Sequence, residues 1–178
     1  YRIAVTSTLS GKACTEWTNA VKITVNNLDE GSIGGDQDIC EGSLATTLTS
    51  VTPVADGTIT YRWYVSTDGA AFALAGVTTE TLNPGILTAD RWYYREVTST
   101  MAGHACTANT NTVHVRVNNF DPGTIMTAQT ICEGGDPATL VSDVAVTFEA
   151  GAVITYQWRE STDGVAYTDI AGATAKLE

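Results

Sequence analysis

The chain has 178 residues, with 9 lysines and arginines against 20 aspartates and glutamates, which gives a formal net charge of -11. Such acidity repels polyanions, so we expect no nucleic acid among its partners. The apolar runs fall short of the ~20 residues that a membrane-spanning helix needs, so we expect no membrane span.

An internal repeat divides the chain into three parts. A shift of 92 positions pairs Cys14 with Cys106, and Cys40 with Cys132. A repeat of about 100 residues with frequent strand and turn signals has the size of an immunoglobulin-like β-sandwich. We therefore predict an all-β array of tandem immunoglobulin-like repeats. Its parts are the C-terminal strands of a partial repeat, a complete repeat and the N-terminal part of a further one, at residues 1–27, 28–119 and 120–178.

Short polar joints link these parts, at residues 26–31 and 118–123. Both joints begin with two asparagines and end in glycine. They are too short to act as flexible tethers, so neighbouring repeats should sit at a restricted angle.

The strands are predicted from alternating apolar residues. In the first part, residues 1–5 and 21–25 read as strands, and residues 21–25 alternate in the same way as the final strand of the complete repeat, residues 113–117. In the complete repeat we expect further strands over residues 31–39, 44–51, 59–65 and 71–75. Each partial repeat would leave an unpaired sheet edge in water, so we expect it to be completed by more chain, from a longer rod or from another copy of the segment.

Tryptophan lies in the middle of the best-defined strands. Trp63 and Trp158 each have apolar residues two positions away, and Ser-Thr-Asp-Gly, a tight-turn sequence, follows both strands. We expect both tryptophans in the core rather than in a sugar-stacking platform. Trp17 corresponds to Asn109 and is predicted on a variable loop, so it is our candidate for contact with a surface ligand.

Tyr94 is our third candidate for a structural role in the core. It stands four residues after an aspartate that follows a leucine, which is similar to the tyrosine corner of immunoglobulin-like domains. We therefore expect its hydroxyl to bond to upstream backbone. The cysteine that antibody domains carry two residues later is replaced by Glu96, so an antibody-type disulfide between the sheets is not expected.

The four cysteines form no Cys-x-x-Cys pair, which favours disulfides and an oxidising compartment over zinc. They could pair across joints, as Cys14 with Cys40 and Cys106 with Cys132, or within the complete repeat, as Cys40 with Cys106. A cross-joint pair would be some 30 Å apart in a linear array, because a final strand intervenes. We therefore predict the Cys40–Cys106 disulfide.

Acidic residues crowd the start of the complete repeat, where calcium could bind between extracellular domains. Only Asp29 and Glu41 match acids in the next copy, so we expect a solvated acidic edge and no cofactor, with calcium as the alternative. The acids are Asp29, Glu30, Asp36, Asp38 and Glu41.

The two histidines indicate no catalytic site. His104 and His114 correspond to Lys12 and Lys22 in the other copy. No nucleophile or carboxylate accompanies them in a repeated way, so we read both as surface residues and expect no enzyme.

Four motifs carry a family resemblance. They are Gln-x-Ile-Cys-x-Gly at 37–42, Tyr-x-Trp-x-x-Ser-Thr-Asp-Gly at 61–69, Leu-Thr followed by Tyr-Tyr-Arg within 87–95, and Cys106; the first two recur at 129–134 and 156–164. With these motifs the chain resembles the tandem immunoglobulin-like (PKD-like) repeats of giant cell-surface adhesins of gliding Bacteroidota, of the SprB type.

The resemblance implies export across the outer membrane by type IX secretion and an extracellular place on the cell surface. It also implies an adhesive or stalk role, with neighbouring repeats as partners and surface polysaccharide or other cells as targets. The alternative is a carbohydrate-binding or accessory module of a secreted polysaccharide-degrading enzyme.

Overall fold

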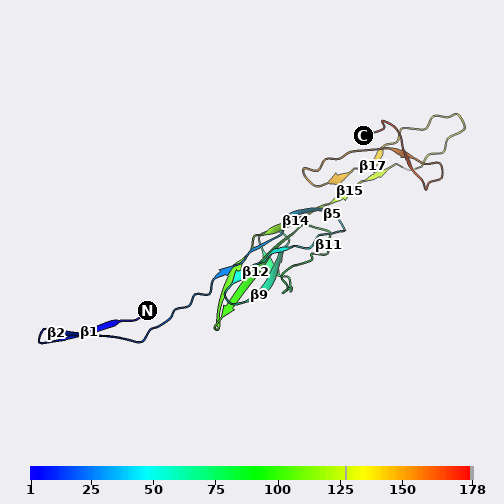
Figure 1. The fold of residues 1–178 in the computed structure, drawn as a ribbon. Coiled ribbons are helices and arrows are strands. Elements are labelled where there is room, and N and C mark those ends of the chain that lie inside the picture. The colour runs from blue at the N-terminus through cyan, green and yellow to red at the C-terminus, as the bar shows by residue number, and fades with distance from the viewer. Residues whose placement is uncertain (127, 177–178) are drawn as a thin grey trace.

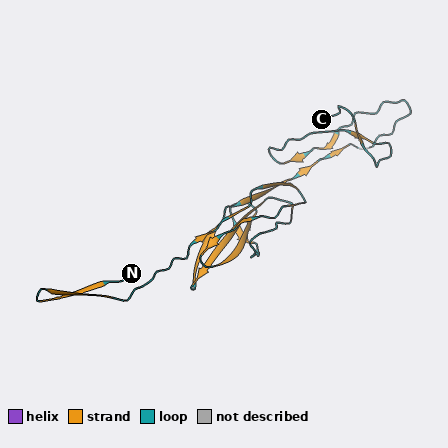
Figure 2. Cartoon of the chain, viewed as in Figure 1, coloured by secondary structure: helices purple, strands orange, loops and turns teal. Residues whose placement is uncertain are grey.

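A computed structural model describes residues 1–126 and 128–176. The described chain is all-β, and its parts follow one another along one line, from an N-terminal hairpin through a layered unit to an open C-terminal part (Figures 1 and 2). The last two residues of the predicted third part, 177 and 178, lie outside the description. Within the described residues, no helix has the length and apolar character of a bilayer span.

The strands are unevenly distributed, and the longest lie in the middle unit. The N-terminal hairpin consists of β1 (Ala4–Leu9) and β2 (Lys12–Trp17). The middle unit consists of β3 (Leu28–Asp29), β4 (Ser32–Ile33), β5 (Gln37–Cys40), β6 (Ser43–Leu44), β7 (Ser50–Val51), β8 (Val54–Ala55), β9 (Thr58–Ser66), β10 (Phe72–Leu74), β11 (Ile86–Leu87), β12 (Arg91–Met101), β13 (His104–Asn109) and β14 (Val113–Asn118). The C-terminal part has only short strands, β15 (Phe120–Asp121), β16 (Thr124–Ile125), β17 (Ser142–Val144), β18 (Thr147–Phe148), β19 (Arg159–Glu160) and β20 (Thr168–Asp169).

The middle unit is built around one large sheet. Its strand order is β10-β9-β12-β14-β5, and β13 pairs with the far end of β12. All pairs are antiparallel except β14 with β5. Short pairs, β3 with β8, β4 with β7 and β6 with β11, supply further strands. The buried core cluster draws on both sets, which is consistent with a β-sandwich; its members are Ile33, Ala45, Leu48, Trp63, Leu82, Leu87, Tyr93, Val113, Val115 and Val117.

Trp63 lies at the centre of this core. Its side chain is fully buried, and its indole Nε1 donates a hydrogen bond of 2.8 Å to the carbonyl of Thr79. Trp158 makes the corresponding bond of 3.1 Å to Ala175, but this tryptophan is only half-buried. The two copies therefore share the local bond and differ in the packing around it.

The Ser-Thr-Asp-Gly turn after each tryptophan strand is closed by the same bonds. In the middle unit the Asp68 carboxylate accepts hydrogen bonds from the amides of Ala70 and Ala71, both at 2.8 Å, and from the Ser66 hydroxyl at 2.7 Å. The backbone amide bonds lower the pKa of Asp68 to about 2, and the Ser66 hydroxyl adds to them. Asp163 in the C-terminal part has the same kind of partners, and its pKa is also lowered to about 2.

The N-terminal part differs from the prediction. The strand expected over residues 1–5 lies instead at Ala4–Leu9, where it forms a hairpin with Lys12–Trp17. Residues 21–25 form no strand, although their pattern matches that of β14. Residues 31–39 and 44–51 are each broken into short strands, the first at Gly34-Gly35.

We expect Trp63→Ala to lower the free energy of unfolding of the middle unit by about 3–5 kcal/mol, because it empties a packed core position. Thermal or urea unfolding would measure this loss. Trp158→Ala is the matched control, since its half-exposed ring should cost much less. Equal losses for the two variants would show that Trp63 does not hold the core.

The acid stability of the hairpin turn should depend on Asp68. Because its pKa is lower in the folded chain than its ordinary 3.8, the carboxylate stabilises the fold above about pH 4, and this contribution is lost as pH falls toward 2. The melting temperatures of the parent and Asp68→Ala should therefore differ above pH 4 and converge near pH 2. Asp68→Asn keeps an acceptor without a titrating group, so a convergence for this variant as large as that for Asp68→Ala would contradict the mechanism.

Candidate functional site: the joint between repeats

The structure does not bring the two predicted disulfide partners together, and all four cysteines carry free thiols. Cys106 lies opposite Ser99 near one end of β12, and Cys40 lies opposite Asn118 at the end of β14. Eight residues of β12 and three of β14 separate these positions, about 36 Å at strand spacing. A disulfide needs Cα atoms within about 7 Å, so the predicted Cys40–Cys106 pair is wrong.

The tyrosine-corner role predicted for Tyr94 is also wrong. Tyr94 points to the outer face of the sheet, where its ring stacks on Tyr64 at 4.8 Å. The adjacent Tyr93 is the one that enters the core. Asp90 holds this corner instead, because its carboxylate accepts hydrogen bonds from the amide of Val117 at 2.7 Å and contacts His114 Nε2 at 2.8 Å.

Trp17 is exposed but lies at the end of strand β2, not on a loop. The guanidinium of Arg2 sits 4.2 Å from the centre of its ring. This cation–π contact covers one face of the ring with the protein's own side chain.

The acidic residues at the start of the middle unit serve separate local bonds. Asp36 accepts a bond from the amide of His114 at 2.8 Å, and Asp38 pairs with Arg116 at 2.7 Å. Across residues 1–126 and 128–176, no group of His, Cys, Asp and Glu is gathered closely enough to hold a metal ion. His104 is exposed, and the imidazole of His114 stacks on Trp92 at 3.9 Å.

The first joint is docked on the tip of the β12–β13 hairpin. The Asn26 side chain donates to the carbonyls of Ser99, at 2.9 Å, and His104, at 3.4 Å. The Ser99 hydroxyl, which is buried, donates back to Asn26 Oδ1 at 2.7 Å. One asparagine side chain thus connects the chain that enters the middle unit with two strands of that unit.

Asn27 makes a second connection at the same end. Its side-chain amide and its backbone amide both donate to the Asp56 carboxylate, at 2.8 and 3.2 Å. Gly57 follows, and a Cβ at this position would lie 2.5 Å from the carbonyl oxygen of Thr100. Only glycine therefore allows this loop to approach β12 so closely.

Each joint then turns in the same way. The Asp29 carboxylate accepts from the amide of Gly31 at 2.9 Å, and Asp121 accepts from Gly123 at 2.8 Å. Both glycines have positive φ, and a Cβ on either would lie 2.2 Å from a backbone carbonyl of the adjacent strand. The repeated Asp-x-Gly therefore fixes the direction in which the chain enters each repeat.

The second joint leaves from the opposite end of the middle unit. Asn118 pairs with Cys40 at the end of β14, and the side chain of Asn119 donates to Glu149 at 3.1 Å. The position of Glu149 in its repeat resembles that of Asp56. The chain therefore enters the middle unit at one end of the large sheet and leaves it at the other (Figure 1).

Arg95 fills the space between the tryptophan strand and the short strand pairs. Its guanidinium donates to the Ser50 hydroxyl and the Glu80 carbonyl, both at 2.6 Å, and to the Glu30 carbonyl at 3.2 Å. It also lies 4.9 Å from the centre of the Tyr61 ring. Burial lowers the pKa of Arg95 from its ordinary value, and the neighbouring Tyr61 and Glu80 oppose this effect.

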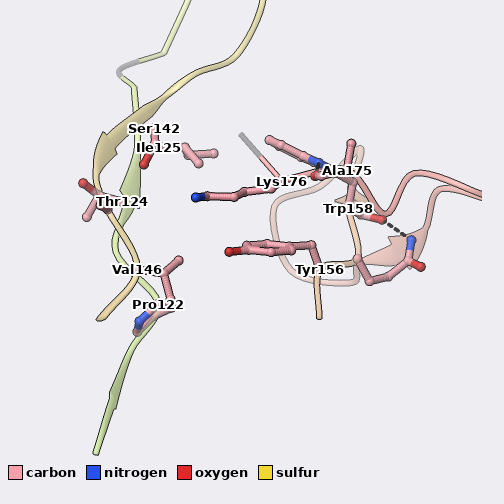
Figure 3. A pocket seen from close by; sticks show the side chains of 11 residues that line it. Pro122, Thr124, Ile125, Ser142, Val146, Tyr156, Trp158, Ala175 and Lys176 are labelled. Carbon is pink, nitrogen blue, oxygen red and sulfur yellow. Dashed lines mark hydrogen bonds between the residues drawn. The ribbon is translucent and has the colours of Figure 1, made fainter. Parts of the chain in front are cut away.

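The C-terminal part has an open groove at the corresponding place. It measures about 360 Å³, and the side chains of Tyr156 and Lys176 reach across it toward the segment that carries Thr124 (Figure 3). Pro122, Ser142, Tyr156 and Lys176 line the groove at the positions of Glu30, Ser50, Tyr61 and Glu80. The groove therefore corresponds to the space that Arg95 occupies in the middle unit.

Sequence reasoning missed a positioning glutamine that stands at the same place in both copies. Gln37 bonds to the amide and carbonyl of Thr46, and Gln129 does the same with Ala138. The shared Gln-x-Ile-Cys-x-Gly motif was the available signal. For Asn26 the available signal was the Asn-Asn pair that both joints share, which reads by itself only as part of a polar linker.

Comparison with known families gives a match to a family described as a domain of unknown function, DUF8696. Its model matches residues 29–119 and, a second time, residues 121–177. Among curated proteins, none matches the chain.

We expect Asn26→Ala to loosen the first joint, because it removes the bonds to Ser99 and His104. Amide relaxation measured by NMR should show hairpin β1–β2 moving more independently of the middle unit. Asn118→Ala removes the equivalent side chain at the other joint and should leave this motion unchanged. Unchanged relaxation in Asn26→Ala would show that the asparagine does not restrain the joint.

Proposed function

We propose that the chain, which belongs to the DUF8696 family of domains of unknown function, is a stalk segment of a large extracellular adhesin. The family model matches the chain twice in tandem. In this proposal each copy is an immunoglobulin-like repeat, and the repeats stack end to end. Their function is to hold an adhesive part away from the cell surface or to contribute contacts along the rod.

The observation that carries this proposal is the path of the chain through the middle unit. The chain enters at the tip of the β12–β13 hairpin and leaves at the end of β14, about 36 Å away at strand spacing. Side-chain bonds at Asn26, Asn27 and Asn119 hold the joints on both sides. A repeat with opposite ends and bonded joints is suited to a stiff rod.

The strand order supports the immunoglobulin-like assignment. The strand order β10-β9-β12-β14 corresponds to the C′-C-F-G order of such sandwiches. Trp63 lies on the strand that corresponds to C, which carries their core tryptophan. The inward position two residues after Tyr93 on the later strand, where antibody domains carry a cysteine, is occupied by Arg95.

The motifs of the chain favour the surface-adhesin family. On the basis of their resemblance to SprB-type repeats, we propose export by type IX secretion, a place on the cell surface and a role in gliding or adhesion. Neighbouring repeats are the first partners, and surface polysaccharide or other cells are the proposed targets. The cysteines at repeated positions fit an oxidising compartment.

The alternative function is a carbohydrate-binding module, in which an exposed tryptophan would stack on the sugar. Trp63 is fully buried and cannot stack on a sugar, while Trp17 is already covered on one face by Arg2. The histidines serve structural contacts or lie exposed, so we propose no enzymatic role.

Small-angle X-ray scattering tests the rod. One, two and three copies of residues 28–119, joined directly, should show a maximum dimension that grows linearly by about 35–40 Å a copy. Growth that falls off with the square root of copy number would indicate flexible joints and overturn the stalk. Labelling of intact source cells by an antibody against residues 28–119 would test the surface location.

A further inference from the structure

Cysteines stand at two places in the repeat, and the structure puts these places at opposite ends. Cys40 lies beside Asn118, where the chain leaves the middle unit. Cys106 lies beside Ser99, where the chain enters it. Cys14 occupies the Cys106 place of the preceding repeat, since it pairs with Ser7 in hairpin β1–β2.

The first joint places the counterpart of Asn118 against Ser99. Asn26 is the counterpart of Asn118, and in the docked joint its side chain bonds to both the carbonyl and the hydroxyl of Ser99. In a sheet, directly paired residues lie about 5 Å apart and direct their side chains to the same face. A cysteine that pairs with Asn26 in the way that Cys40 pairs with Asn118 would therefore flank the same contact as Cys106.

We propose that the cysteine at the Cys40 position of one repeat forms a disulfide with the cysteine at the Cys106 position of the following repeat. The bond would cross every joint of the rod in the same direction. This inference rests on the tandem rod proposed above.

The proposal accounts for the four free thiols. Cys14 and Cys106 stand at the Cys106 place of the first and second repeats, and Cys40 and Cys132 stand at the Cys40 place of the second and third. No two of the four cysteines are therefore an outgoing and receiving pair.

The chemistry is a thiol–disulfide exchange. The two cysteine thiols lose two protons and two electrons as their S–S bond forms, and a small disulfide such as oxidised glutathione takes them up as its own S–S bond breaks into two thiols. Cys40 is exposed and Cys106 is half-buried, so such an oxidant can reach both.

The bridge would add a covalent restraint to the bonds of the Asn26 position. A pulling force that separates two repeats would break the hydrogen bonds of the asparagine first. The disulfide would then still hold the two repeats together. The proposed bond thus makes each joint resistant to opening in an oxidising environment and sensitive to reductants.

Two copies of residues 28–119 joined directly provide the test, because the fusion reproduces the native Asn-Asn-Leu-Asp joint. Each copy carries its own core, since every buried apolar residue in the described part of the chain lies between Ile33 and Val117. In the cross-joint variant, Cys106→Ser in the first copy and Cys40→Ser in the second leave only the proposed pair. In the control variant, both cysteines of the first copy remain, and those of the second are replaced by serine.

Both variants are incubated at low concentration with oxidised glutathione and analysed by intact mass and thiol counting. The cross-joint variant should lose two hydrogens and both thiols as a monomer, at a rate at least ten times that of the control. A cross-joint variant that keeps its thiols, forms only dimers or glutathione adducts, or closes no faster than the control overturns the disulfide. Small-angle scattering from the reduced sample tests the rod independently of the disulfide. A fusion that is extended in scattering but forms no cross-joint disulfide would contradict this inference and not the proposed stalk.

Discussion

The middle unit depends on strand β12, which closes the core. This strand pairs with β9 along most of its length, with β14 at its start and with β13 at its end. Its inward side chains include Tyr93, Arg95 and Val97, all buried. A buried guanidinium is costly unless its donors are satisfied, and the bonds from Arg95 to Ser50, Glu80 and Glu30 give partners to its two terminal nitrogens, while its buried Nε has none among the described residues. These bonds also connect the large sheet to the short strand pairs.

The C-terminal part shows which features of the middle unit form from local bonds. The C-terminal part forms the glutamine bonds, the Ser-Thr-Asp-Gly turn and the indole bond of Trp158, as the middle unit does. Its groove stays open, however, and its strands stay short. Local motifs therefore form the framework of a repeat, and β12 with β14 converts that framework into a core.

The joints explain how one repeat can direct the next. Asn26 and Asn27 attach the incoming chain to the hairpin tip and to Asp56, and the Asp-x-Gly turn then sets its direction. Entry and exit lie at opposite ends of one sheet, so the chain crosses the middle unit parallel to its strands. In the proposed rod, tension would therefore run along the strands, and the ladder bonds of β12 and β14 would share it.

Much of this architecture is predictable from the sequence, because it depends on bonds and periodicity within a few residues. The alternation around Trp63, the hairpin after Ser66 and the all-β class follow from the sequence alone. The phase of the alternation in β12 cannot be read from the sequence, because either Tyr93 or Tyr94 could face inward. The bonds of Asp90 to β14 place Tyr93 in the core. The arrangement of Cys40 and Cys106 was equally beyond sequence, since it depends on strand order.

Residues 21–25 and 113–117 mark the limit most clearly. Both segments alternate apolar and polar residues, yet Val21, Ile23 and Val25 are 56%, 67% and 65% exposed, while Val113, Val115 and Val117 are 0–2% exposed. The sequence by itself determined which face of each segment is apolar. Only the tertiary structure decided whether that face is buried, because a strand acquires its hydrogen bonds and its core from partners distant in sequence, which for residues 113–117 are β5 and β12.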